Sequence, residues 1–497
     1  MRLRRLRATG EFELLAVLPD ARTPDARSAA ERLARDPRVA IAEPDRWLRP
    51  ALVPNDPDYY YQWPLHESVS EIAAANSPPA WDLSTGRRAV TIAVIDSGLV
   101  PHPDLDPQRV LPGYDFIGDA LVANDGDGRD SDPADAGDWV DDDHIARLGA
   151  LCGHARARSS WHGTQMAGIV GASGNNAAGI AGVNWGAYLL PVRVLGSCGG
   201  WMSDVADGVR WAAGLAVAGA PPNPWPARVI NLSLGGAGAC TAFMQHAIDA
   251  AVRAGAVVVA AAGNGAEPWS VADAAAMMPG NCAGVVAAAS VDRSGNRSWY
   301  SRIGATVALS APGFAWSLSN RGLTAPAGSG YAAIQGTSVS AALVSGVASL
   351  MLSVNPALTP AQIGAGLRAA ARPFPDGSDC AAGGCGAGML DAQAAVLTAA
   401  AMPARPMASG AGGPCFLATA AYGSAAAPEL AYLRRFRDRY LLTHAPGRAL
   451  VAAYYALSPP LARLVGAHPA LRAVVRLGLV PYVVLARWLT SDAAAGR

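Results

Sequence analysis

The sequence predicts an α/β fold in which a doubly wound, mostly parallel sheet carries helices on both faces. Short runs of apolar, often β-branched residues alternate with alanine-rich helical stretches from about residue 86 to residue 400. Within these runs the apolar residues are continuous rather than alternating with polar ones, as expected for parallel strands that are buried on both faces. The length of 497 residues leaves room for a main domain of roughly 300 or more residues with smaller flanking segments.

Each element of the central domain follows from this pattern. Ligand sites in such sheets gather at the carboxyl ends of the strands, so residues that directly follow the apolar runs have the greatest functional weight. The expected strands are 90–95, 189–194, 229–232, 257–260 and 285–288, and the expected helices are 203–218, 241–254 and 338–353.

The flanks differ in composition from the central domain. Residues 11–46 indicate a small βαβ-like unit: a strand at 11–18, a helix capped by Thr23-Pro24, and a returning strand at 39–42. Residues 47–60 contain three prolines among polar residues and indicate an exposed connector. A segment rich in Pro, Gly and Ala ends the central domain. We therefore expect the divisions 1–55, 56–400, 401–414 (linker) and 415–497 (a helical tail).

The charge pattern excludes one class of function. Thirty-nine arginines, with no lysine, balance 39 acidic residues, which argues against a nucleic-acid binder. Arginines interrupt the most apolar stretch of the tail, so we expect no membrane-spanning helix there. The charges are segregated, because residues 115–143 hold eleven Asp and one Arg, whereas residues 415–497 hold ten Arg and three acids.

The N-terminus and the cysteines point in different directions on cellular location. Residues 1–7 are basic, but no apolar stretch follows, so either the chain is leaderless or its start lies further upstream. Seven cysteines without the close pairs of zinc sites indicate an oxidising compartment. Six of them fall in the central region, and six cysteines allow fifteen pairings.

Three polar residues, each beside glycine, stand where α/β elements end or begin. Asp96 follows the strand at 90–95, His162 leads into a helix of small residues, and Ser338 begins another such helix. There the Ser338 hydroxyl would lie at the positive end of a helix dipole, beside free backbone N–H groups. Taken singly, each has a structural interpretation, as a turn residue, a core histidine or a helix N-cap. As a set, they supply a nucleophile, its base and the acid that orients the base.

The motifs around these residues carry a family resemblance. Ala93-Val-Ile-Asp-Ser-Gly98, Trp161-His-Gly-Thr-Gln-Met-Ala-Gly168 and Gly336-Thr-Ser-Val-Ser340, in the order Asp, His, Ser, resemble those of subtilisin-like serine peptidases. The resemblance covers roughly 56–400, and segments 53–59, 130–139 and 194–200 are similar to the secreted, disulfide-bonded bacterial branch. It implies a secreted or cell-surface serine endopeptidase that cleaves extended polypeptides through an acyl-enzyme, with Asp96, His162 and Ser338 as catalytic residues.

The same resemblance assigns the residues that hold the substrate. Ser233, Leu234 and Gly235 resemble the edge that pairs with an extended peptide by β-augmentation, and Ala262 and Gly263 belong to the opposite wall of the first specificity pocket.

Other matches concern the transition state and the pocket floor. Asn264 matches the oxyanion-hole asparagine, which works with the Ser338 backbone N–H, although asparagine after glycine is also a common turn. Met277 and Met278 fall at the pocket floor, where side chains of their size can shorten the pocket, and the preference for the residue on the acyl side of the cleaved bond stays open.

Two departures from the family pattern support a rival interpretation. Gln165 stands where a second histidine is usual, and residues 341–343 replace the usual Ser-Pro-His. A catalytically weak scaffold that binds peptides is therefore one alternative to the peptidase. A second makes the tail the main functional unit, with the peptidase as its cargo.

Calcium is the expected cofactor, at two places. Clustered carboxylates repel one another unless a cation joins them, and hard oxygen ligands suit Ca²⁺, although a solvated acidic loop is the alternative. The candidates in this loop are Asp125, Asp127, Asp130 and Asp132. By resemblance, Asp104 and Asn176 match side-chain ligands of the family's tight calcium site.

The resemblance also covers the cysteines and the flanks. It pairs Cys152 with Cys198, Cys240 with Cys282 and Cys380 with Cys385, and it leaves Cys415 over. Residues 11–46 resemble the back part of an inhibitory propeptide, a partner that would occupy the cleft until cleavage in 47–57.

The tail has two interpretations. Its first residues, 415–423, resemble a C-terminal box of exported bacterial proteins. Apolar residues then recur at helical spacing opposite arginines, and such a helix can lie on an anionic membrane surface. A small helical domain that packs on itself is the alternative. The residues concerned are Leu430, Leu433, Phe436 and Tyr440, opposite Arg434, Arg435 and Arg439.

Overall fold

The computed structural model describes residues 2–9, 12–18, 26–43, 52–152, 155–265 and 272–403, with scattered positions from 418 to 468 and the helix at 469–490. The chain divides into two compact units, Met1–Ala51 and Leu52–Arg497.

The first unit is an antiparallel strand pair followed by a helix. Strand β1 (Arg2–Thr9) pairs with β2 (Phe12–Leu18), and α1 (Ala26–Leu33) buries Ala29 and Ala30. The strand at 11–18 and the helix agree with expectation, whereas the returning strand at 39–42 is wrong, because these residues pair with nothing in sheet register. β2 instead pairs with the arginine-rich segment before it, which a much shorter loop brings close. The Thr23-Pro24 cap lies outside the described residues.

A seven-stranded sheet forms the centre of the second unit, in the order β11-β10-β8-β6-β3-β5-β4. Every neighbouring pair is parallel. The strands are β3 (Thr91–Asp96), β4 (Tyr114–Asp115), β5 (Tyr188–Arg193), β6 (Val229–Leu232), β8 (Val257–Ala261), β10 (Val285–Val291) and β11 (Val307–Pro312).

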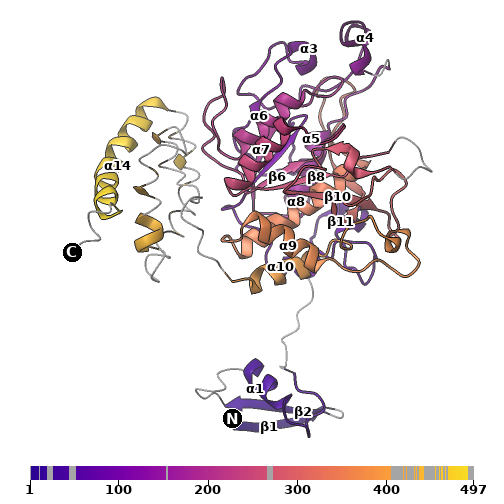
Figure 1. Cartoon of the computed structure of the whole chain (residues 1–497), viewed down its shortest axis with the longest axis vertical. Helices are drawn as coiled ribbons and strands as arrows, with labels where there is room; N and C mark the ends of the chain where they lie inside the picture. The colour runs from indigo at the N-terminus through magenta and orange to yellow at the C-terminus, as the bar shows by residue number, and fades with distance from the viewer. Residues whose placement is uncertain are drawn as a thin grey trace. The chain divides into compact units, whose positions relative to one another are not determined.

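Helices cover both faces of this sheet, which confirms the doubly wound fold (Figure 1). Ile92 and Val94 of β3 belong to one apolar core, and Ala93 and Ile95 belong to the other, because successive strand residues point to opposite faces. The first core contains α5 (His162–Gly171), α8 (Thr337–Val354), α9 (Pro360–Ala370) and α10 (Ala392–Ala401), and the second contains α6 (Met202–Ala212) and α7 (Ala242–Arg253). The helix expected at 203–218 ends early, before Gly214 in the left-handed region.

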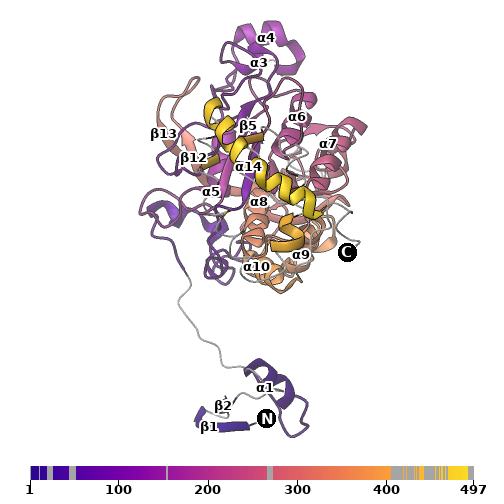
Figure 2. The same ribbon diagram turned by 90° about the vertical axis from the view of Figure 1, so that its left-hand side faces the viewer.

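α8 passes through the middle of the first core. Among the described residues it is the single helix long and apolar enough to cross a membrane, and 89% of it is buried inside the protein. It is therefore a core helix. Two antiparallel strand pairs complete the unit. β7 (Gly236–Ala237) pairs with β9 (Met277–Met278) across an intervening helix and strand, and β12 (Phe314–Asn320) forms a hairpin with β13 (Ser329–Gln335), in which β12 packs against α5 (Figure 2).

The carboxyl end of β3 lies at a switch in strand order. β5 and β6 flank β3 on its two sides. After β3 the chain forms β4 and β5 on one side, and after β5 it crosses to β6 on the other. Loops that leave β3 and its neighbour therefore diverge, which opens a crevice for a ligand at this edge. Asp96, the last residue of β3, lies there.

In the tail, α14 (Pro469–Thr490) packs against the few other residues that are described there. Leu479 contacts buried Leu430 and Ala418, and Arg476 donates to the carbonyl oxygen of Ala421. These contacts favour a helical domain that packs on itself. Cys415 and most of the linker lie outside the described residues.

Candidate active site

Asp96 and His162 meet at the carboxyl end of β3. The ring Nδ1 of His162 lies 2.7 Å from Asp96 Oδ1, which also accepts the Ser97 backbone N–H at 2.8 Å. Asp96 is fully buried, and the His162 side chain is 22% exposed. Gly163 permits this approach, because a methyl group built on it would lie 2.2 Å from the Gly98 carbonyl oxygen. The expected pair is thus brought together, with Nε2 of the imidazole on the side away from Asp96.

Two further carboxylates act on His162. Burial lowers the pKa of the imidazole, the Asp96 carboxylate raises it, and Asp138 and Asp135 raise it further, so that the pKa of His162 is above its ordinary value. The charged form of the imidazole is therefore more favourable here than in water. This suits a base that must accept a proton.

Asp138 and Asp135 also fix the backbone around the histidine. Asp138 accepts the Ser160 N–H and hydroxyl, each at 2.6 Å, and the Ser160 hydroxyl oxygen accepts the His162 N–H. Asp135 accepts the Ser97 hydroxyl at 2.7 Å, and burial raises the pKa of this carboxyl to about 7. Both residues lie in the 130–139 segment that resembles the bacterial branch, but the sequence assigned neither a role beside the histidine, because contacts across 22 and 38 residues are not visible in local spacing.

Ser338 occupies the second position of α8. Its Oγ donates to the Ser233 carbonyl oxygen at 2.9 Å, and Ser233 Oγ donates to the Ser338 carbonyl oxygen at 2.8 Å. The hydrogen bonds of the described residues include none between Ser338 and His162. Catalytic hydrogen bonds often form only when substrate is bound, and a rotation about one bond redirects this hydroxyl.

Asn264 faces the start of α8. Its Oδ1 accepts the Thr337 N–H and hydroxyl, each at 3.0 Å, which leaves its amide nitrogen with no partner among the described residues. The Ser338 N–H belongs to the first turn of α8, where backbone donors have no intrahelical acceptor. Two N–H donors therefore lie beside the Ser338 hydroxyl.

A cleft of about 720 Å³ lies next to these groups. Ser233, Leu234 and Gly235 line it together with His162 and Asp138, so the expected substrate edge faces the same space as the histidine. Ala262 is buried, and the Gly263 N–H donates to Thr337 Oγ1 at 3.2 Å, which ties this second segment to α8.

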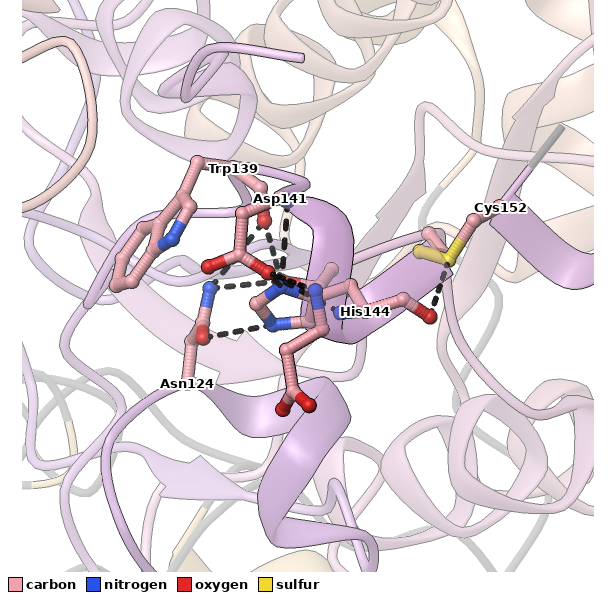
Figure 3. The surroundings of a disulfide bond; sticks show 8 residues. Asn124, Trp139, Asp141, His144 and Cys152 are labelled. Carbon is pink, nitrogen blue, oxygen red and sulfur yellow. Dashed lines mark hydrogen bonds and ion pairs between the residues drawn. A yellow bond between two sulfur atoms is a disulfide. The ribbon is translucent and has the colours of Figure 1, made fainter. Parts of the chain in front are cut away.

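The three expected disulfides are present, and one joins the acidic loop to the rim of the cleft. Cys152 bonds to Cys198, Cys240 to Cys282, and Cys380 to Cys385. Helix α4 (Asp142–Leu148) precedes Cys152; Asp141 caps it, and His144 reaches Asn124 Oδ1 at 3.0 Å (Figure 3). Cys198 itself lines the cleft, so this network fixes one of its sides.

The acidic loop has protein partners where a cation was expected. Asp125 pairs with Arg193, which is fully buried and also bonds Asp115. Asp130 accepts the Asp132 N–H at 2.8 Å, and Asp132 accepts the Ala134 N–H at 3.0 Å. Asp127 takes no part in a metal cluster, and no group of three acidic, His or Cys ligands occurs among the described residues. The expected gathering of these four aspartates is therefore not seen, because an arginine and backbone donors satisfy the loop.

Asp104 and Asn176 lie together, as expected. Asn176 Nδ2 donates to Asp104 Oδ1 at 2.9 Å, and Ile180 N–H donates to Asp104 Oδ2 at 2.8 Å. Buried Asp56 accepts the backbone N–H groups of Asn175 and Asn176. Burial, with a contribution from Asp56, raises the pKa of Asp104 to about 6, and no arginine hydrogen-bonds to either carboxylate in the described structure. A buried acidic pair of this kind fits a cation.

The comparisons with known proteins agree with this geometry. The sequence profile of the subtilase family (peptidase S8) matches residues 87–402. An extracellular protease of Xanthomonas campestris is 45% identical over 377 residues, which are 76% of this chain and 62% of that protein. An extracellular basic protease of Dichelobacter nodosus is 39% identical over 399 residues, 79% of this chain and 64% of that one. The chain thus spans slightly less than two thirds of the length of these relatives.

A solved structure extends the match to three dimensions. A protease from Pseudoalteromonas arctica is 44% identical, with a TM-score of 0.65 over 70% of this chain and 100% of the other. Because the profile match covers more than half of the chain and includes Asp96, His162, Asn264 and Ser338, the chain belongs to the subtilase family.

Proposed function

We propose that the chain is a serine endopeptidase that hydrolyses peptide bonds in extended polypeptides. The observation that carries the proposal is the 2.7 Å contact between buried Asp96 and His162 Nδ1. A carboxylate at Nδ1 holds the imidazole in the tautomer whose Nε2 accepts a proton, and it stabilises the imidazolium that results.

In this mechanism, the Ser338 hydroxyl turns from Ser233 towards His162 and attacks the peptide carbonyl carbon as its proton passes to Nε2. The oxyanion that forms accepts hydrogen bonds from Asn264 Nδ2 and the Ser338 N–H. The C–N bond breaks as His162 returns the proton to the leaving amine, which leaves an acyl-enzyme on Ser338. Water then repeats these steps and releases the acid. Ser233, Leu234 and Gly235 would hold the substrate backbone on one side, and Ala262 and Gly263 on the other.

The test is casein hydrolysis by purified wild type in oxidising, calcium-containing buffer, beside Ser338→Ala. Digestion by wild type alone supports the proposal. If both proteins are folded and leave casein intact, the peptidase proposal falls, and the alternative of a peptide-binding scaffold is favoured.

Replacing Asp138 by asparagine is expected to shift the acidic limb of the pH profile to lower pH. The base must be neutral to act, so activity falls as pH drops through the raised pKa of His162. The asparagine side chain would keep an acceptor for Ser160 but remove a negative charge, so the pKa of His162 falls and activity persists in more acidic buffer. The measurement is kcat/KM across the pH range from acidic to mildly alkaline buffer.

Asp143→Asn is the matched control. It removes the same charge from the same acidic stretch, where Asp143 pairs with Arg147 on the protein surface. An equal shift in both variants would mean that overall charge, and not the field of Asp138 on His162, sets the acidic limb.

We infer that calcium stabilises the fold through Asp104 and Asn176. The support is the buried carboxylate pair of Asp104 and Asp56, which lacks a bonded arginine among the described residues. Calcium supplies compensating positive charge there and takes no part in the reaction.

Chelation by EDTA in mildly alkaline buffer is therefore expected to lower Tm by several degrees, since a ligand at about a hundred times its Kd stabilises by about 2.7 kcal/mol. Asp104→Asn should abolish most of this calcium dependence, and Asp125→Asn should retain it, because Asp125 is paired with Arg193. The reverse result would locate the calcium in the acidic loop. Differential scanning calorimetry with and without calcium measures both.

The flanks and the location complete the proposal. Two relatives named extracellular, together with three disulfides, support secretion or a cell-surface position. We propose the first unit as a propeptide that is removed by cleavage in 47–57. Contact of the tail with a surface or membrane interface is supported by exposed Val474, Leu477 and Val484 on α14.

A further inference from the structure

Two chain segments flank Ser338 and define where a substrate side chain enters. Residues 233–236 form the first, and Ser233 exchanges two hydrogen bonds with Ser338. Residues 261–264 form the second, which is bonded to Thr337 through Gly263 and Asn264. A carbonyl attacked by Ser338, with its oxygen at Asn264 Nδ2, directs the side chain on its acyl side between these segments. We call this space the acyl-side pocket.

The Met277 side chain fills the acyl-side pocket. A methyl group built on Gly263 would lie 2.7 Å from Met277 Cγ, and one built on Gly235 would lie 3.4 Å from Met277 Cε. The thioether chain thus lies beside both segments, with Cγ next to Gly263 and Cε next to Gly235. Its position is fixed by β9, in which Met277 lies opposite Ala237 of β7.

Arg302 closes the same pocket from the side of Gly263. Its Cδ lies 3.0 Å from the methyl position on Gly263. Its guanidinium donates to the carbonyl oxygens of Asn264 and Asp273, at 3.3 and 3.2 Å, which anchors the side chain there.

The open volume lies elsewhere along the substrate path. The cleft of about 720 Å³, which we call the outer cleft, is lined by residues 233–236, by Met278 and by apolar Met202, Val205 and Met244. Neither Met277 nor residues 261–264 line it in the described part of the chain. Large substrate side chains therefore find room further along the peptide, and not beside the cleaved bond.

We propose that Met277 restricts the residue on the acyl side of the cleaved bond to glycine, alanine or serine. The inference rests on the proposed peptidase function. A leucine or phenylalanine at this position requires the thioether to leave both segments, which forfeits its contacts with them. Because a methionine chain is flexible, the result is a preference of about 10- to 100-fold and not complete exclusion.

The test uses the peptide series succinyl-Ala-Ala-Pro-X-p-nitroanilide, with X as alanine, leucine or phenylalanine. Wild type is expected to have a kcat/KM for alanine at least about 10-fold above that for phenylalanine. Met277→Ala, which empties the pocket, should raise kcat/KM for phenylalanine by about 10- to 100-fold and change the value for alanine little.

Two variants separate pocket closure from a general effect on the site. The sequence placed Met278 at the pocket floor beside Met277, but in the structure Met278 lines the outer cleft, which Met277 does not. Met278→Ala therefore makes the same change one residue along and should leave the alanine-to-phenylalanine ratio as in wild type. Met277→Leu keeps most of the volume and should keep the preference. If Met277→Ala fails to fold, the ratio of kcat/KM for the alanine peptide to that for the phenylalanine peptide in wild type still tests the proposal.

The failures of the inference and of the proposed function are distinguishable. If wild type digests casein but prefers phenylalanine, the peptidase function still stands and the proposed role of Met277 is wrong. An equal change of the ratio in Met277→Ala and Met278→Ala also contradicts it. Protein that hydrolyses neither casein nor any peptide contradicts the peptidase function itself.

Discussion

Replacing Ser338 by alanine is expected to lower kcat by about 10⁶-fold, the magnitude known for loss of the nucleophile from a related serine peptidase. Alanine keeps the first turn of α8 but removes the one atom that can form the acyl-enzyme. It also removes the hydrogen bond from Ser338 Oγ to the Ser233 carbonyl oxygen, while the bond from Ser233 Oγ to the backbone of residue 338 remains. The variant should therefore fold normally.

Two readouts should change together in this variant. Casein stays intact, and the intact mass no longer shows cleavage within residues 47–57, if that connector is the site of self-processing. His162→Ala should cost about as much as Ser338→Ala, and the double variant little more, because the two groups act as one unit. Additive losses, or self-processing that survives in Ser338→Ala, would contradict the triad.

Replacing Asn264 by leucine is expected to lower kcat by about 10²- to 10³-fold with little change in KM. The amide nitrogen has no partner among the described residues until the oxyanion forms, so its hydrogen bond stabilises the transition state and not bound substrate. Steady-state kinetics on one peptide substrate separate kcat from KM.

Leucine also removes the acceptor of Thr337, so a second variant is needed. Asn264→Asp keeps an oxygen for the Thr337 N–H and hydroxyl but lacks the N–H donor. If the loss came from a displaced α8, the aspartate variant would be nearly as active as wild type. Low activity in both variants, with unchanged Tm in the aspartate variant, assigns the loss to stabilisation of the oxyanion and not to the position of α8, since aspartate lacks the donor and also repels the oxyanion.

β4, which has only two residues, and β11, which contains Ser310 and ends in Pro312, were not predicted. The other five strands of the sheet were predictable because they are mostly apolar and buried on both faces. A run such as Ile92–Ile95 is then apolar throughout, and Asp96, the polar residue that ends the strand, stands out. The disulfides and the Asp96–His162 pair were predicted from the family resemblance of the motifs and cysteines, and the structure contains both. The strand pairing of the first unit was harder to predict. The arginine-rich sequence of β1 shows no alternation of apolar and polar residues that would distinguish a strand from a basic tail.

Contacts between distant segments account for most of what the sequence did not reveal. In the sequence, Asp125 resembles a calcium ligand. In the structure it pairs with Arg193, which is 68 residues away in the chain. In the sequence, Asp138 resembles part of a solvated loop. In the structure it accepts a hydrogen bond from Ser160, which in turn accepts the His162 N–H. The reach of Met277 from Gly263 to Gly235 depends on a register between two short strands that local spacing does not specify.

The burial of α8 has a consequence for how the protein loses its chemistry on heating. Ser338 belongs to the first turn of a helix that runs through the first core, and Asp96 ends β3, an inner strand of the sheet with neighbours on both sides. Neither residue sits on a segment that can open by itself, since release of either one requires the same cooperative unit to separate. Partial unfolding at the periphery therefore leaves the reacting groups aligned, and their alignment reports the integrity of the whole domain.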